Sequence, residues 1–108
     1  MTQTHHFLPD LVKAAGEIPP DSILSRTLHD DAHCKVVLFA FAAGQALSEH
    51  SAAHSAHLYL VQGEALLTLG ENSYTASSGA WAAMPPRLPH SVQAKTPLIL
   101  LLTLMKGG

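Results

Sequence analysis

The chain of 108 residues has little charge of either sign and only one cysteine. Six lysines and arginines oppose eight aspartates and glutamates, so the formal net charge is -2. A phosphate backbone would meet no basic surface, which argues against nucleic acid as a partner. Cys34 alone can form neither an internal disulfide nor a thiolate-rich zinc site, and nothing demands an oxidising compartment. We therefore expect a cytoplasmic protein.

Long apolar segments are also missing. Residues 1–8 are polar and predict no secretory signal. The longest apolar run, Leu98 to Met105, is interrupted by Thr103 and is far shorter than the ~20 residues that span a bilayer. We expect no membrane partner and interpret this run as a buried strand.

Short hydrophobic runs bounded by glycine and proline follow one another about every 8–12 residues, with no long amphipathic helix between them. This pattern is typical of an all-β sandwich or barrel. The predicted strands cover residues 22–29, 34–42, 58–62, 64–69, 73–76, 80–84, 90–94 and 98–105. A single helical turn is expected after Pro9 and Asp10, ending at Gly16. The length allows one domain, which we divide into an N-terminal extension, 1–21, and a barrel, 22–108.

Histidine is the unusual component, because its eight copies outnumber the lysines and arginines together. It titrates near neutrality and is the commonest metal ligand. We expect His5 and His6 in a solvated terminus, and His29 and His33 exposed beside a turn of two aspartates. The other four histidines lie in two motif-like segments.

These segments, 44–63 (GQALSEHSAAHSAHLYLVQG) and 79–90 (GAWAAMPPRLPH), place glycine, proline and histidine at fixed intervals. Here the chain resembles the cupins. Their first motif is glycine, five residues, His-x-His, three or four residues, Glu, six residues and glycine; their second is glycine, five residues, Pro-x-Gly, two residues and His. His50, Pro85 and His90 stand at matching positions. The resemblance implies a double-stranded β-helix, the cupin jelly-roll barrel, with a short N-terminal extension, similar to small single-domain members that have no assigned reaction.

In metal-containing cupins, the two histidines and the glutamate of the first motif join the histidine of the second around one ion. This chain departs from that set, because Ala52 replaces the second histidine and Ala56 the glutamate. Imidazole donors near the motifs could hold a divalent Zn, Fe, Ni, Mn or Cu ion, and we expect no organic cofactor. The candidate metal ligands are His50, His90, His54 and His57.

Each candidate has an alternative reading. His50 and His90 could be a polar pair that lines the cavity without metal. On a regular strand His57 would face away from the interior with Tyr59. His54 lies in a connection, from which it could reach the cavity, but a surface role stays open for both His54 and His57.

A barrel pocket is expected to be lined by Phe41, Tyr59 and Met84. Arg87 is the only cation near either motif, which disfavours a phosphorylated ligand and favours a small uncharged or aromatic one. Three functions remain open: a metal-dependent enzyme, with a dioxygenase-like oxidoreductase as the first candidate; a metal-free binding or sensing module; and a structural protein with a vestigial pocket.

Three further expectations concern packing. Met84 and Trp81 should pack in the core, although Trp81 could also bridge two subunits, and Cys34 should be a small buried side chain. Small cupins are commonly homodimers, and the strand near Ile23 to Leu28 could pair with the sheet of a second copy.

Overall fold

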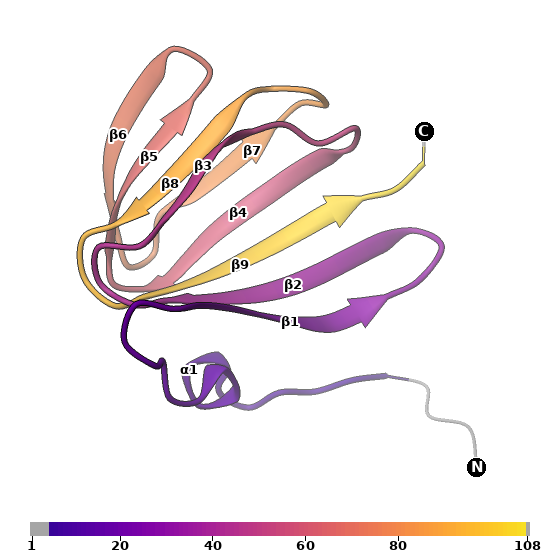
Figure 1. The fold of residues 1–108 in the computed structure, drawn as a ribbon. Helices are drawn as coiled ribbons and strands as arrows, with labels where there is room; N and C mark the ends of the chain where they lie inside the picture. The colour runs from indigo at the N-terminus through magenta and orange to yellow at the C-terminus, as the bar shows by residue number, and fades with distance from the viewer. Residues whose placement is uncertain (1–4, 108) are drawn as a thin grey trace.

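The computed structural model describes residues 5–107, and for His50 it describes the backbone but not the side chain. Within this range two antiparallel sheets face each other, and the short helix α1 (Leu11–Ala15) lies outside them (Figure 1). The strands are β1 (Ile23–Asp30), β2 (Cys34–Phe41), β3 (Ala46–His50), β4 (Ser55–Gln62), β5 (Glu64–Leu69), β6 (Asn72–Ser77), β7 (Trp81–Met84), β8 (His90–Ala94) and β9 (Leu98–Met105). The prediction of an all-β jelly roll is confirmed.

The strand orders are β1-β2-β9-β4-β7 in one sheet and β3-β8-β5-β6 in the other. Consecutive strands therefore often belong to different sheets, which is how a jelly roll wraps its chain around one core. The strand predictions for 64–69, 90–94 and 98–105 match β5, β8 and β9 in both bounds. The apolar run at the end of the chain forms β9, in the middle of its sheet. No helix among residues 5–107 is long and apolar enough to cross a membrane.

The sequence pattern did not predict β3. Its residues, ALSEH, include no β-branched or aromatic side chain, so local propensity gives little signal. Pairing with β8 holds this segment extended, through Ala46 opposite Gln93 and Leu47 opposite Val92. Tertiary pairing thus decides a strand that the local sequence leaves undetermined.

The helical turn near the N-terminus is confirmed. The Asp10 side chain accepts hydrogen bonds from the backbone N–H groups of Val12 and Lys13, as an N-cap does. Gly16 ends the helix with a φ of 70°. The Arg26 side chain of β1 donates to the Ala14 carbonyl oxygen, at 3.0 Å, and fastens the helix to the sheet.

The core fills the space between the two sheets. Its side chains come from the inward-facing positions of most strands, and the most deeply buried include Phe41, Leu58, Leu60, Val92, Leu98 and Leu100. Along β4 the buried Ala56, Leu58 and Leu60 alternate with the exposed His57 and Tyr59. This alternation fixes which side chains of the first motif can reach the barrel interior.

Candidate functional site

The two motif histidines come together through strand pairing. His50 ends β3 and His90 begins β8, and the two residues are directly opposite each other in the antiparallel ladder. The His90 side chain is buried, with 6% of its surface exposed. The side chain of His50 lies outside the described residues, so its part in a metal centre stays a prediction.

The imidazole of His90 is held by a backbone group. Its Nδ1 lies 2.9 Å from the carbonyl oxygen of Leu88. A carbonyl only accepts, so Nδ1 is the donor in this contact, which fixes the orientation of the ring. Metal-bound histidines are commonly oriented by this kind of bond, and it equally suits a histidine that accepts a hydrogen bond from a ligand.

Two alanines occupy the remaining positions of the family's metal set. Ala56 faces the interior of β4, with 2% exposure, between Leu104 of β9 and Met84 of β7. A methyl group therefore stands where the family places a carboxylate. Ala52 lies in the loop after β3, and its carbonyl oxygen accepts a bond from the Arg87 N–H at 2.7 Å, which joins the two motifs.

Arg87 replaces the inner glycine of the second motif. It adopts a φ of 66°, in the left-handed region where glycine carries no steric penalty. The backbone at this position thus has a conformation that glycine adopts more readily than arginine.

His57 and Tyr59 point away from the interior. Their exposed side chains share the outer face of β4, and the His57 ring meets the Trp81 ring edge to face with centroids 5.2 Å apart. The expectation that Trp81 packs in the core is wrong, because it is 62% exposed at the sheet edge, on the face of its register partner Tyr59. Met84, 3% exposed, does pack in the core.

His54 is exposed in the β3–β4 loop, where it lines a shallow hollow with Pro86 and Met105. Among the described side chains, His54, His57 and His90 do not form a three-ligand group. A metal site formed with His50, as expected from the sequence, therefore stays a prediction.

A larger hollow opens between β6 and β7, the facing edges of the two sheets. Its volume is about 640 Å³, within the ~300–1,000 Å³ typical of small-molecule sites. The residues that line it are aliphatic, aromatic or small and polar, and none of them carries a formal charge at neutral pH: Leu67, Leu69, Tyr74, Thr75, Ala76, Ser77, Ser78, Ala80, Trp81, Ala82 and Ala83.

The pairing of β5 with β8 places His90 next to a residue that lines this hollow. Leu69 is the register partner of His90, so their side chains share a face of the sheet. Of the predicted pocket residues, Phe41 and Met84 lie in the buried core and Tyr59 on the outer surface. None of these three lines the hollow. The sequence pointed to it only through the alternation along β5, which turns Leu67 and Leu69 inward.

A second group of donor atoms lies at the β1–β2 turn. His29, Asp31 and Cys34 bring their ligand atoms within 4.8 Å of one another. Sequence reasoning placed His29 and His33 on an exposed turn and Cys34 in the core. In the structure His29 and Cys34 are both half-buried, and His29 Nε2 lies 2.7 Å from Asp31 Oδ2. The available signal was the run HDDAHC at residues 29–34, with five donor side chains in six positions.

Comparison with known proteins agrees with this architecture. A family model described as "Cupin domain" matches residues 37–104. No curated protein matches the sequence.

Several solved structures superpose over nearly the whole chain. A conserved protein of unknown function from Streptococcus pyogenes is 27% identical, with a TM-score of 0.85 over 98% of this chain and 92% of that one. A cupin superfamily protein from Desulfitobacterium hafniense is 20% identical, with a TM-score of 0.84 over 99% and 95%. An RmlC-like cupin from Shewanella frigidimarina is 22% identical, with a TM-score of 0.79 over 99% and 96%.

Proposed function

Since the chain belongs to the cupin family, whose domain model covers most of its length, we propose that it binds a small uncharged or aromatic molecule between its two sheets. The hollow between β6 and β7 carries this proposal, because it has the volume of a small-molecule site and no charged lining. Tyr74 and Trp81 offer aromatic surfaces at its rim. His90 adjoins the lining through Leu69 and offers a polar group to orient the ligand.

The absence of charge in the lining argues against phosphorylated or carboxylate ligands. An anionic group buried without a cationic or multiple N–H partner loses its hydration without compensation. A neutral ring gains from both the apolar floor and the aromatic rim. The polar lining residues Thr75, Ser77 and Ser78 would offer hydrogen-bonding groups, from backbone or side chain, to a neutral polar substituent.

The single tryptophan makes the test direct. Trp81 lines the hollow, so its fluorescence should change saturably with a neutral aromatic probe such as benzamide or phenol, and much less with benzoate or phenyl phosphate. Binding should also raise the melting temperature.

Two tyrosines give a matched pair of variants. Tyr74→Ala should weaken binding about 2- to 10-fold, the range of one aromatic contact. Tyr59→Ala removes the same side chain from the outer face, beside Trp81 but outside the lining, and should weaken binding much less than Tyr74→Ala. No saturable response to any neutral probe, or equal losses in both variants, would contradict the proposal.

A histidine-bound divalent metal is the second candidate, and the Nδ1 bond of His90 to Leu88 is the observation that favours it. His50 and His90, with His54 or His57, would hold the ion, and the ion would act as a Lewis acid on a bound substrate in a dioxygenase-like enzyme. The donor set fits only in part, because Ala52 and Ala56 contribute no ligand. Metal analysis of tag-free Cys34→Ser protein, reconstituted with each ion, tests it: bound metal that is lost in His90→Gln supports the candidate, and a substoichiometric content contradicts it.

We also propose a homodimer and a cytoplasmic location. β1 is an edge strand, and an edge offers backbone groups to the sheet of a second copy. Light scattering at micromolar concentration should give twice the chain mass, and Leu24→Lys on β1 should shift the protein towards monomer. A monomeric wild type would contradict the dimer.

A further inference from the structure

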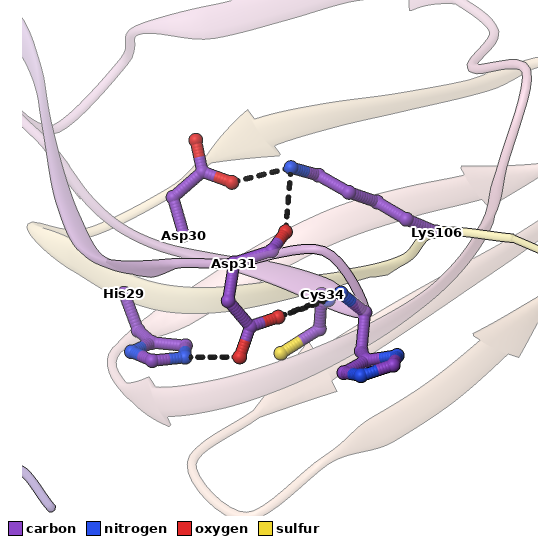
Figure 2. Close-up of polar contacts among 6 residues, drawn as sticks. His29, Asp30, Asp31, Cys34 and Lys106 are labelled. Carbon is purple, nitrogen blue, oxygen red and sulfur yellow. Dashed lines mark hydrogen bonds and ion pairs between the residues drawn. The ribbon is translucent and has the colours of Figure 1, made fainter. Parts of the chain in front are cut away.

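The turn between β1 and β2 collects three kinds of metal-binding side chain at one place. His29 is the last but one residue of β1, Asp31 lies in the turn and Cys34 begins β2 (Figure 2). Their ligand atoms all lie within 4.8 Å of one another. An ion placed among them would open the 2.7 Å contact between His29 Nε2 and Asp31 Oδ2 and draw the more distant ligand atoms closer.

A strand irregularity brings two of the three donors to the same face. Thr27 pairs with Val37, but His29 pairs with Val36, so β1 carries a bulge between them. His29 therefore shares the face of Val36 and not that of Val37. Alternation along β2 puts Cys34 on the face of Val36 as well. Without the bulge, the imidazole and the thiol would lie on opposite faces.

This face is the outer one. The inward positions of β2 are those of Phe39 and Phe41, which pack in or against the core. Cys34 is an odd number of residues away from Phe39 and Phe41, so its side chain points to the other face of β2. Leu38 shares this other face and lines a surface hollow with Ala15 of α1. The group at the turn is therefore separate from the barrel interior and from His90.

The carboxylate of Asp31 is held in place from several sides. Its Oδ1 accepts bonds from the backbone N–H groups of His33 and Cys34, at 2.7 and 2.9 Å, and its Oδ2 faces His29 Nε2. These contacts hold the pKa of Asp31 well below its usual range, and the bond to His29 has the largest effect. The carboxyl group is therefore an anion near neutrality. Lys106 bonds to the Asp31 carbonyl oxygen and the Asp30 carboxylate, which fastens the turn to the end of β9 (Figure 2).

Space for a further ligand adjoins the group. A hollow of about 460 Å³ lies between the N-terminal segment and β1, and both His6 and His29 line it. The two rings are edge to face, with centroids 5.3 Å apart. An ion held at the turn therefore has a path to solvent and an accessible open position.

We propose that His29, Asp31 and Cys34 form a binding site for a divalent zinc-type ion on the outer face of the barrel. Imidazole, carboxylate and thiolate together suit Zn²⁺ or Co²⁺, whereas Ca²⁺ and Mg²⁺ prefer oxygen donors alone. Binding deprotonates the Cys34 thiol, and the proton passes to solvent. The three protein ligands leave the fourth tetrahedral position to water or to a nearby imidazole.

Cobalt gives a test that only this site can satisfy. Cys34 is the single cysteine, so a thiolate-to-cobalt charge-transfer band can arise from no other place in the chain. Titration of tag-free, reduced protein with Co²⁺ should develop this band to saturation at one ion per chain, and Zn²⁺ should abolish it by competition. Cys34→Ser should remove the band while circular dichroism shows an intact fold.

Three further variants complete the test. His29→Gln and Asp31→Asn should each weaken Co²⁺ binding at least about tenfold, since even changes outside the ligand set cost that much. Glu71→Gln, at an exposed carboxylate in the turn between β5 and β6, should leave the band and the affinity unchanged. The proposal is overturned if no band develops, if Co²⁺ binds without one, or if His29→Gln and Asp31→Asn bind as tightly as the wild type.

Discussion

His57 of β4 and Trp81 of β7 meet edge to face on the outer surface, with ring centroids 5.2 Å apart. Alternation along β4 puts His57 on the face opposite to the buried Ala56 and Leu58, where the two rings can meet. It also ties the edge strand β7, which is only four residues long, to its neighbour.

We predict that this pair stabilises the fold by about 0.5–1.5 kcal/mol beyond its buried area. A double-mutant cycle of His57→Ala and Trp81→Ala, measured by urea unfolding, should give that coupling energy. The pair His57→Ala and Tyr74→Ala serves as control and should be additive. Additivity of the first cycle as well would show that the ring contact contributes nothing.

Gly63, between β4 and β5, should tolerate no side chain. Its φ is 107°, and a Cβ there would lie 2.3 Å from the Pro97 carbonyl oxygen. Gly79 is a matched control, because its φ is 95° but a Cβ would meet nothing within 4 Å. Gly79→Ala should therefore cost only backbone strain, about 1–3 kcal/mol, and Gly63→Ala clearly more. Equal losses in the free energy of unfolding would show that the close approach to Pro97 is unimportant.

Phe41 and Leu98 are register partners on β2 and β9, and both are fully buried. Leu98→Ala should lower the free energy of unfolding by about 2–5 kcal/mol, because the surrounding sheets cannot collapse onto the cavity. Leu24→Ala on the edge strand β1, where the side chain is 40% exposed, should cost much less. Denaturant unfolding of both variants checks the difference, and similar costs would mean that the core is not centred on this pair.

Restoring the family's ligands should create a metal centre in the barrel. The double variant Ala52→His with Ala56→Glu, made in the Cys34→Ser background, should bind one further equivalent of Zn²⁺. Without metal its melting temperature should fall, because the change at the buried Ala56 places a carboxylate in the core with no partner to compensate its lost hydration.

Zn²⁺ should then raise the melting temperature of the double variant more than that of its parent. The matched control is Ala53→His with Ala83→Glu, because both alanines are exposed. If the restored variant binds no more Zn²⁺ than this control, the two motifs do not converge as the resemblance implies.

Strand positions followed from the sequence where hydrophobic alternation and turn residues agree. β5, β8 and β9 have the predicted bounds because glycine, proline or a polar turn encloses each of them. β3 has no such composition and is extended because β8 pairs with it. The alternation of β4 also predicted that His57 and Tyr59 share a face, and the structure places both on the outside.

The site followed from the sequence only in part. The motif spacing brought His50 and His90 to neighbouring strands, where they are register partners. It could not locate the hollow, because β6 and β7 are consecutive in the chain yet form the edges of opposite sheets. Nor could it place Trp81, whose exposure depends on β7 being an edge strand.

The sequence by itself determined the family, the all-β class and the two motif histidines, because these depend on local spacing and on a period of two residues. Only the tertiary structure decided which side chains meet. A bulge in β1 brings His29 to the face of Cys34, and the edges of two sheets form the hollow beside Tyr74. Both depend on strand register and sheet order, which are set by packing across the barrel and leave no periodic trace along the chain.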